Sequence, residues 1–245
     1  MTAQAQTTST TRAEKSRRHD TGTVRLGQRD IDGLLLCGEH YAVPSDLLAE
    51  ALGVNPDRLH TITSRWRRAG YLDTNRLGPG PTWYWLTPKG MTATGLGFPA
   101  TRPALGRLAH IRAILAARLW LTAGPAWADG RAWWHSERRL LTEHPRHRGG
   151  HVPDAEIHWP AIDGSPYADQ IWAIEVELTA KQIERTTRIM TGLLSPMRYA
   201  TVVYLTSPAA RSTVLRAVAS LPAADQSRVA VRDLPANAYN PAWPL

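Results

Sequence analysis

Two glutamates separated by one residue, Glu175 and Glu177, lie in an apolar run from Ile171 to Leu178 that is typical of a β-strand. Side chains two positions apart on a strand project from the same face, roughly 6–7 Å apart. Carboxylates held that close repel each other and need a compensating cation. A hard divalent metal ion, bound by one or two carboxylates together with water and a substrate phosphate, would provide it. This strand is therefore the first candidate for chemistry.

Asp154, in an earlier apolar run from Val152 to Trp159, is the third acid of the candidate site. In this interpretation Asp154 and Glu175 bridge one Mg²⁺ or Mn²⁺ ion, and Glu177 holds a second ion or orients the attacking water. The metal would polarise a phosphate and lower the pKa of a bound water. The alternative is a ladder of surface charges along a sheet edge, which is harder to arrange for an acid in a central, apolar strand.

Basic residues follow the second acidic run. Lys181 is one of three lysines among the 29 basic residues, and its compact ammonium group would stabilise charge that develops on the phosphate. Lys181, Arg185 and Arg188 have the spacing of one helix face, which suits contacts along a phosphate backbone. A surface ion pair between Glu184 and Arg188 is the simpler alternative.

Three histidines, His144, His147 and His151, precede Asp154 in a loop rich in arginine, glycine and proline. They lack the rigid spacing of a helix, so a loop that contacts phosphate is preferred over a transition-metal site. His151 is the main candidate because it lies closest to the acid. Glu137 is a further candidate acid from an earlier helix-like stretch, although a solvated helix residue is the simpler interpretation.

The elements that must position these residues predict an α/β fold (α+β overall). Residues 104–235 are expected to form a mixed sheet flanked by helices. Leu105, Leu108, Ile111, Leu115 and Leu119 are expected to face inward from a long helix. Residues 96–103 are interpreted as a linker, and residues 236–245 as an irregular tail. The remaining pattern shows short apolar runs near 126–127 and 132–134 and a helix-like stretch at 136–141. It predicts helices near 180–194 and 209–221, and strands near 152–159, 171–178, 199–205 and 228–233.

Residues 25–95 are expected to form a separate domain of three helices and a two-stranded ribbon. Ser45 is the expected N-cap of the second helix. Asn55-Pro56 supplies an N-cap and a proline at the first helical position of the third, which Gly70 ends. The exposed face of this third helix is polar and basic, and carries His60, Thr61, Thr63, Ser64, Arg65, Arg67 and Arg68.

The helix end from Trp66 to Leu72, the hairpin with its Gly/Pro turn at 77–81 and the closing sequence Leu86-Thr87-Pro88-Lys89-Gly90 resemble the winged helix-turn-helix family. The resemblance implies that the third helix enters the major groove and that the wing lies along the DNA backbone. Winged helices that bind proteins are the alternative. The residues that would contact phosphate or guanine are Arg65, Arg67 and Arg68 on the helix and Arg76 on the wing.

In the second half, Pro153-Asp154, Glu175-x-Glu177 and the basic stretch after them resemble the P-D…(D/E)-x-K nuclease superfamily. Together with the winged helix and Ser136-Glu137-Arg138, residues 26 to 205 resemble the replication-relaxation family of plasmid and mobile-element proteins. This implies a DNA-binding protein of replication or transfer with an endonuclease-like domain. Glu177 stands where the superfamily has lysine. Some restriction endonucleases share that glutamate, and Lys181 could reach back instead; if neither applies, the site holds metal or DNA without cleavage.

The amino-acid composition agrees with DNA as a partner but does not identify the partner. The chain has 245 residues and a net charge of +8, with a pI near 10.1, which favours a polyanionic partner over a merely solvated basic surface. The single cysteine, Cys37, excludes an internal disulfide and fits a cytoplasmic protein. No apolar stretch approaches the length of a membrane span. Residues 1–24 are expected to be a disordered basic tail rather than a secretory signal.

We therefore expect a cytoplasmic, two-domain protein whose partner is double-stranded DNA. A second copy of the chain and replication or transfer proteins are further candidate partners. The acids predict Mg²⁺ or Mn²⁺ as cofactor. Two other functions remain open: a DNA-binding regulator with a degenerate nuclease fold, and a scaffold for replication or conjugation factors.

Overall fold

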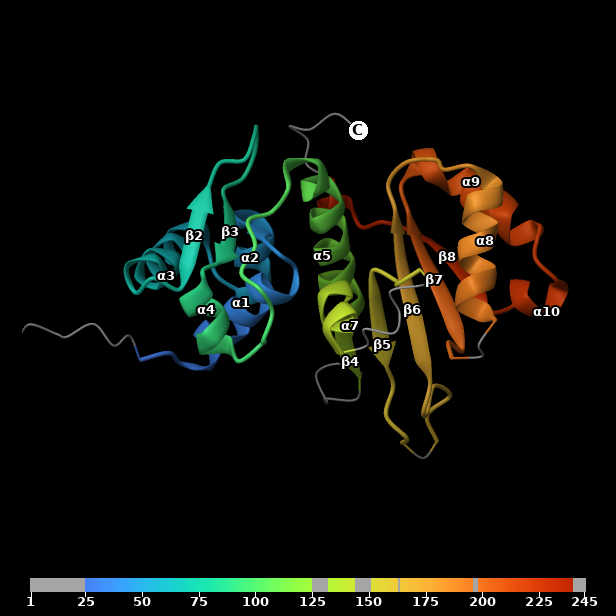
Figure 1. Ribbon diagram of the computed structural model, residues 1–245, viewed down its shortest axis with the longest axis horizontal. Helices are drawn as coiled ribbons and strands as arrows, with labels where there is room; N and C mark the ends of the chain where they lie inside the picture. Colours follow the sequence, from blue (N-terminus) through green and yellow to red (C-terminus); the bar gives the residue numbers. More distant parts are fainter. Residues whose placement is uncertain (1–24, 125–131, 144–150, 163, 196–197, 240–245) are drawn as a thin grey trace, which may run out of the picture.

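The computed structural model describes residues 25–124, 132–143, 151–162, 164–195 and 198–239. Its described part is a mixed α/β structure with a three-stranded sheet in the N-terminal half and a five-stranded sheet in the C-terminal half, which confirms the expected fold class (Figure 1). The expected tail of residues 1–24 lies outside the described residues. None of the helices in these ranges is long and apolar enough to cross a lipid bilayer.

The N-terminal half has the expected order of three helices and a hairpin, with two additions. A short strand, β1, pairs with β3, so the sheet has the order β1-β3-β2 and is not a two-stranded ribbon. A helix that the sequence analysis did not predict, α4, follows the hairpin. The elements are α1 (Gln28–Glu39), β1 (Val43–Pro44), α2 (Ser45–Leu52), α3 (Pro56–Arg68), β2 (Leu72–Asn75), β3 (Trp83–Leu86) and α4 (Pro88–Thr94).

Local sequence explains where α3 begins and ends. The Asn55 side chain accepts a hydrogen bond from the backbone N–H of Arg58 at 2.9 Å, and Pro56 occupies the first helical position. Gly70, with a φ of 75°, reverses the chain after the helix. One expected cap was wrong: Ser45 is the first residue of α2, and Pro44 takes the N-cap position.

The closing sequence after β3 locks the hairpin against α3. Thr87 caps α4 by accepting from the backbone N–H of Gly90 at 3.1 Å, and donates to the carbonyl of Gly70 at 2.6 Å. Lys89 donates to the carbonyl of Ala69 at 2.7 Å, where α3 ends. A Cβ at Gly90 would lie 2.1 Å from the carbonyl oxygen of Tyr71, so this position requires glycine.

The C-terminal half builds one mixed sheet in the order β4-β5-β6-β7-β8. Its first two pairs are antiparallel and its last two are parallel. The elements are η1 (Leu105–Arg107), α5 (Leu108–Thr122), β4 (Trp133–Ser136), α7 (Glu137–Glu143), β5 (Ala155–His158), β6 (Ile171–Glu177), α8 (Ile183–Leu194), β7 (Thr201–Thr206), α9 (Pro208–Ala219), α10 (Ala223–Gln226), β8 (Val229–Asp233) and η3 (Ala236–Ala238).

Three details differ from the sequence-based expectation. Leu105 is 65% exposed because it lies in a 3-10 turn ahead of α5 and not on the inward face of the helix. Lys181 lies outside α8, which begins at Ile183 with Gln182 as its N-cap. Part of the expected irregular tail, η3, is a short 3-10 helix with a buried Ala238.

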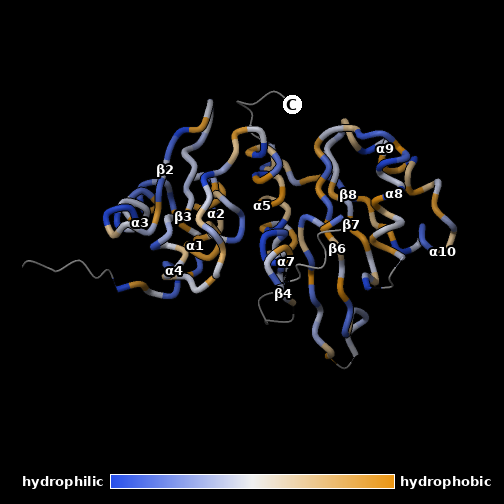
Figure 2. Tube along the Cα trace, in the orientation of Figure 1, coloured by the Kyte–Doolittle hydropathy of each residue, from blue (hydrophilic) through white to orange (hydrophobic). Residues whose placement is uncertain are grey.

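Helices cover both faces of the five-stranded sheet (Figure 1). Ile174, Val176 and Leu205 pack with buried alanines of α5 on one face, whereas Ala173 and Tyr204 face α8 and α9 on the other. This alternation is the period of two that strands impose. In Figure 2 apolar residues concentrate in the strands and in α5, whereas α3 is predominantly hydrophilic.

The two halves form one packed unit around α5. Arg112 on this helix is 4% exposed and forms a bidentate pair with Asp46, with distances of 3.0 and 2.5 Å. Arg118 on α5 and Arg139 on α7 both bind Glu39 at the end of α1, at 2.7 and 2.9 Å. Phe98 is buried in the shared hydrophobic cluster, so the expected linker, residues 96–103, packs against the protein.

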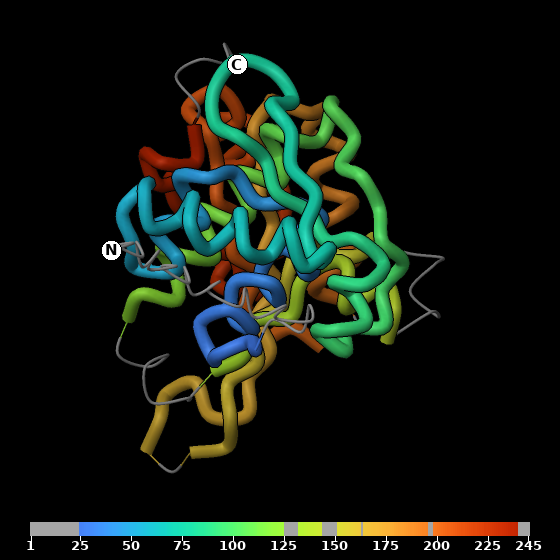
Figure 3. Tube along the Cα trace, turned by 90° about the vertical axis from the view of Figure 1, so that its left-hand side faces the viewer, coloured from blue at the N-terminus to red at the C-terminus, as the bar shows by residue number. Residues whose placement is uncertain are grey.

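The connection between β5 and β6 projects from the body, as Figure 3 shows. Three aromatic rings hold its base together: Trp159, Tyr167 and Trp172 have centroids 5.0 to 5.1 Å apart. These rings stabilise one another.

Candidate functional site

Asp154 lies immediately before β5, at the point where the ladder between β5 and β6 ends. Its Oδ2 accepts a hydrogen bond from the backbone N–H of Val176 on β6 at 2.8 Å. Its Oδ1 lies 2.9 Å from Nε2 of His110 on α5. The carboxylate thus replaces a missing strand partner and ties the sheet to the helix beneath it. Because of this hydrogen bond and charge, the pKa of His110 is raised despite burial, which lowers it.

Glu175 is 5% exposed, and its Oε1 lies 2.7 Å from Nε2 of His151. Burial raises the pKa of Glu175 to about 7; the hydrogen bond with His151 opposes this rise, and the negative charge of Asp154 adds to it. Burial lowers the pKa of His151, but the hydrogen bond with Glu175 together with the negative charges of Glu175 and Asp154 raises it overall. The Glu175 carboxyl and the His151 imidazole are therefore hydrogen-bonded groups whose pKa values are both raised.

Glu177 points to the same sheet face as Glu175 and is 6% exposed. Its Oε2 lies 2.5 Å from Nζ of Lys181. The lysine comes from the turn before α8, so it reaches back to the strand without belonging to the helix face that the sequence predicted for Lys181, Arg185 and Arg188.

Tyr204 is a member of this site that the sequence analysis missed. It lies on β7 directly opposite Glu175 in the parallel register, and its hydroxyl is buried without a hydrogen-bond partner in the described part of the chain. Burial raises the pKa of Tyr204, and the charges of Glu175, Glu177 and Asp154 raise it further. The alternation of Val202 and Tyr204 along an apolar strand was the signal that could have placed it.

Three carboxylates and a buried hydroxyl supply oxygen atoms, the ligand type that a hard divalent cation prefers. Among the described residues, however, the ligand atoms of Asp154, Glu175 and Glu177 do not all lie within 4.8 Å of one another, so the structure does not assemble the predicted metal site in this arrangement. Each carboxylate also has a partner within the protein: Asp154 binds His110 and Val176, Glu175 binds His151, and Glu177 binds Lys181. A metal ion bound to these carboxylates would therefore have to displace these partners. Chemically, the group can hold a cation or a proton, and Lys181 can hold an anion.

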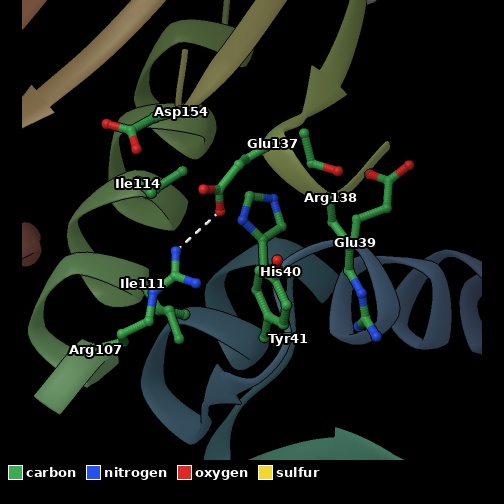
Figure 4. Close-up of a pocket in the computed structure, with 10 residues that line it drawn as sticks. Glu39, His40, Tyr41, Arg107, Ile111, Ile114, Glu137, Arg138 and Asp154 are labelled. Carbon is green, nitrogen blue, oxygen red and sulfur yellow. Dashed lines mark hydrogen bonds and ion pairs between the residues drawn. The ribbon is translucent and has the colours of Figure 1, made fainter. Parts of the chain in front are cut away.

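A small cavity borders Asp154 at the junction of the two halves (Figure 4). It has a volume of about 20 Å³, which is room for one water molecule and not for a nucleotide. Glu137, the further candidate acid, lines this cavity and binds Arg107 at 2.9 Å. The Arg107 and Arg138 guanidinium groups lie over the Tyr41 ring beside it, at 5.2 and 4.7 Å from its centroid. This region is a packed junction between the two halves of the molecule.

The arginines predicted to contact DNA fall into different surroundings. Arg67 and Arg68 on α3 and Arg76 on the turn between β2 and β3 are exposed. Arg65 is 43% exposed at its side chain and binds Asp30, which also accepts from the indole N–H of Trp66 at 2.9 Å. The placement of Thr63 on the exposed face was wrong: its side chain is buried and donates to the carbonyl of Leu59 at 3.0 Å.

Arg58 is exposed near the start of α3 and was not singled out from the sequence, although it lies one turn before Thr61 and two turns before Arg65. Arg185 and Arg188 are exposed on α8. The helices α3 and α8 lie towards opposite ends of the long axis of the molecule, with α5 and the sheet between them (Figure 1). The two sets of arginines therefore belong to separate surfaces.

A second cluster of titratable side chains was also missed. His135 on β4 and Glu156 and His158 on β5 each offer a ligand atom, and these three atoms lie within 4.8 Å of one another; among the described residues they are the group that meets this distance. The spacing of Glu156 and His158 repeats the i, i+2 pattern that identified Glu175 and Glu177. That pattern was the available signal.

Comparisons with known proteins do not assign a family. No protein-family model matches the chain, and no curated protein matches it. Among solved structures it is similar to N,N-8-amino-8-demethyl-D-riboflavin dimethyltransferase (RosA) from Streptomyces davawensis, with 17% sequence identity and a TM-score of 0.19. The match covers 78% of this chain and 56% of that one, so the chain spans little more than half the length of its neighbour. A TM-score this low carries no argument.

Proposed function

We propose that the protein binds double-stranded DNA through α3 and the hairpin that follows it. The observation that carries this proposal is the exposure of Arg58, Arg67, Arg68 and Arg76 on a helix and wing whose own packing does not use them. A third helix presented in this way fits the major groove, and a basic hairpin tip suits the phosphate backbone. The net charge of +8 favours the same partner.

Asp30 supports the proposal by holding the helix in place. It accepts hydrogen bonds from the backbone N–H of Gly27 and the indole of Trp66, both at 2.9 Å, and it binds Arg65. The helix is therefore presented with a fixed orientation, and fixed orientation lowers the entropy that binding would cost. Arg65 acts in this proposal as an anchored residue at the rim of the interface.

Fluorescence anisotropy with a labelled duplex tests this function. The double variant Arg67→Ala/Arg68→Ala is expected to bind about 10–100-fold more weakly than the wild type at a fixed salt concentration, with a shallower salt dependence, because two phosphate contacts are lost. Arg216→Ala removes an exposed arginine from α9, at the other end of the molecule, and serves as the matched control. Equal affinity of the double variant and the control would refute DNA binding through α3.

A second candidate function, divalent-metal-dependent cleavage of a phosphodiester, is favoured by two contacts: Glu177 pairs with Lys181, and the buried Glu175 lies close enough to Asp154 and Lys181 for their charges to act on it. Mg²⁺ or Mn²⁺ held by these acids would polarise the phosphate and acidify a bound water. The base and the cation that balances the phosphate charge would come from the protein's own side chains. The Glu175 carboxyl, whose pKa is raised to about 7 and whose Oε1 lies 2.7 Å from His151 Nε2, would serve as a base near neutral pH, and Lys181 would balance charge on the phosphate oxygens.

Incubating supercoiled plasmid with the protein and each metal tests cleavage. We expect nicking with Mg²⁺ or Mn²⁺ that Glu177→Gln and Lys181→Ala each abolish while DNA binding persists. Arg216→Ala should retain full activity. Binding without nicking by the wild type would instead favour a regulator that holds DNA and does not cut it.

The biological setting extends the proposal. The resemblance to replication-relaxation proteins supports a cytoplasmic role in the replication or transfer of a plasmid or similar element, and makes replication or transfer proteins and a second copy of the chain candidate partners. Exposed arginines on α8, Arg185 and Arg188, offer a second basic surface for DNA at the other end of the molecule.

A further inference from the structure

His135, Glu156 and His158 form a compact cluster on the sheet face opposite α5. His135 pairs with Glu156 across β4 and β5, and His158 follows two positions later on the same face. Their neighbours on the other face, Trp134 and Ile157, pack in the α5 cluster. The three side chains therefore converge because of strand register, and their positions do not depend on a loop.

Glu156 is built into the protein as an oriented carboxylate. Its side chain is 1% exposed, and its Oε1 accepts from the hydroxyl of Tyr199 at 2.6 Å and from Arg198 at 2.8 Å. Its Oε2 faces Nε2 of His158 at 2.7 Å. Fixing one oxygen with outer partners directs the other towards the histidines, which is how proteins orient the carboxylate ligand of a metal.

The two imidazoles complete the set and remain accessible. Their rings stack with centroids 4.2 Å apart and an angle of 23° between the planes. His135 and His158 are both half-buried, so solvent and ions can reach them. Trp133, which pairs with His158 in the register of β4 and β5, is 53% exposed beside them.

We propose that His135, Glu156 and His158 bind a transition-metal ion of the Zn²⁺ class. Two imidazole nitrogens and one carboxylate oxygen are the ligand set that such ions prefer, whereas Mg²⁺ prefers oxygen ligands alone. Ligand bonds of about 2.0–2.2 Å require small side-chain rotations that exchange the contact between Glu156 and His158 for two bonds to the ion. The fourth position faces solvent and takes water. The ion would tie the edge strand β4 to β5, and it is distinct from any Mg²⁺ bound at Asp154, Glu175 and Glu177.

Titration of the purified full-length protein with Zn²⁺ against a chromophoric chelator tests the site. The wild type is expected to bind one equivalent of Zn²⁺. His135→Ala and His158→Ala should each lower the affinity for this ion by at least about 100-fold, because loss of even a residue that only orients a ligand typically lowers metal affinity by about 10–100-fold. Two matched variants should leave this equivalent unchanged: His60→Ala removes an exposed histidine on α3, and His151→Ala removes the histidine beside Glu175.

Co²⁺ provides a second measurement that does not depend on affinity alone. Its visible d–d bands report a four-coordinate site of nitrogen and oxygen ligands, and Glu156→Gln should remove them while circular dichroism stays unchanged. The amide can still accept from Tyr199, which makes this variant the least disruptive one. Retention of the equivalent in both histidine variants, or its loss in His151→Ala alone, would overturn the proposal.

Discussion

Asp30 in the N-terminal half and Glu175 in the five-stranded sheet are both buried carboxyl groups, and their surroundings shift their pKa values in opposite directions. Burial alone would raise the pKa of Asp30, but hydrogen bonds from Gly27 and Trp66 and the charge of Arg65 lower it overall. Burial raises the pKa of Glu175 to about 7; it has one histidine partner and a neighbouring anion, Asp154. The number of donors around each carboxyl decides its charge.

The difference separates two kinds of site. A carboxylate with three donors and a lowered pKa stays ionised at neutral pH and anchors α3, so the exposed basic face of this helix, the proposed DNA-binding surface, has a fixed orientation. A carboxyl that is hydrogen-bonded to His151, lies near another acid and has a pKa of about 7 is poised to change its charge near neutral pH. The first arrangement suits recognition, and the second suits binding of a cation or transfer of a proton. Four changes test this contrast.

The largest effect is expected from Asp30→Ala. It leaves the buried indole N–H of Trp66 and the backbone N–H of Gly27 without their acceptor, which should lower the free energy of unfolding by about 3 kcal/mol. Urea unfolding measures this loss of stability. Asp32→Ala, an exposed acid on the same helix, is the control and should stay within about 0.5 kcal/mol of the wild type. A loss no greater than that of the control would mean that Asp30 does not anchor the helix.

The second effect is a pH dependence carried by Glu175. Its folded-state pKa is raised from 4.5 to about 7, so the folded state binds the proton more tightly than the unfolded state. The stability from this group is complete below about pH 4.5 and is lost as the pH rises through 7, by on the order of 2–3 kcal/mol.

Chemical unfolding between pH 5 and 8 measures this dependence, and Glu175→Gln should flatten the profile. Glu184→Gln, an exposed acid on α8, should leave the profile as in the wild type. Asp30 has the opposite sign, since its lowered pKa stabilises the fold above its unfolded value and the contribution is lost as the pH falls. A Glu175→Gln profile as steep as that of the wild type would contradict this assignment.

A smaller effect is expected from Asp154→Asn. The amide oxygen can still accept from Val176, but the negative charge next to His110 is removed. The pKa of His110 should fall, because burial is then no longer opposed by the carboxylate. NMR titration of the imidazole C–H signal measures this shift, and about 1 kcal/mol of stability should be lost with it. An unchanged His110 pKa would show that Asp154 does not hold this histidine.

The smallest effect on stability is expected from Arg68→Ala. The side chain is exposed on α3, so the free energy of unfolding should change by less than about 0.5 kcal/mol while DNA affinity falls. Thermal unfolding and anisotropy, measured on one preparation, separate the two quantities. A loss of stability as large as the loss of binding free energy would place Arg68 in the packing and not at the interface.

Periodicity and caps were sufficient to predict most elements. The proline after Asn55 fixed the start of α3, and alternation along Ile171–Glu177 fixed which face carries both glutamates. Very short elements without a strong pattern were harder to predict. β1 has two residues and exists because β3 offers an unpaired edge, which is a tertiary effect that a single sequence does not show.

The candidate site was only partly predictable for the same reason. The i, i+2 rule located Glu175 and Glu177, but the partners His110 and Tyr204 come from α5 and β7, elements distant in sequence. The cluster of His135, Glu156 and His158 depends on the register between β4 and β5. The connection between these strands is long and contains α7, so its sequence does not determine the register. Lys181 was placed on a helix because the boundary at Ile183 is set by capping within one turn.

The bidentate pair between Arg112 and Asp46 has a consequence for dissecting the molecule. α5 follows the segment 96–103 in sequence, yet its guanidinium groups and apolar side chains complete the core of the helices before it. A fragment that stops at residue 95 would leave Asp46 and Glu39 without their arginines and would lack the part of the shared hydrophobic cluster that comes from α5 and the sheet. Such a truncation would aggregate, and a protease that cuts near Pro99 would yield two pieces that migrate together under native conditions.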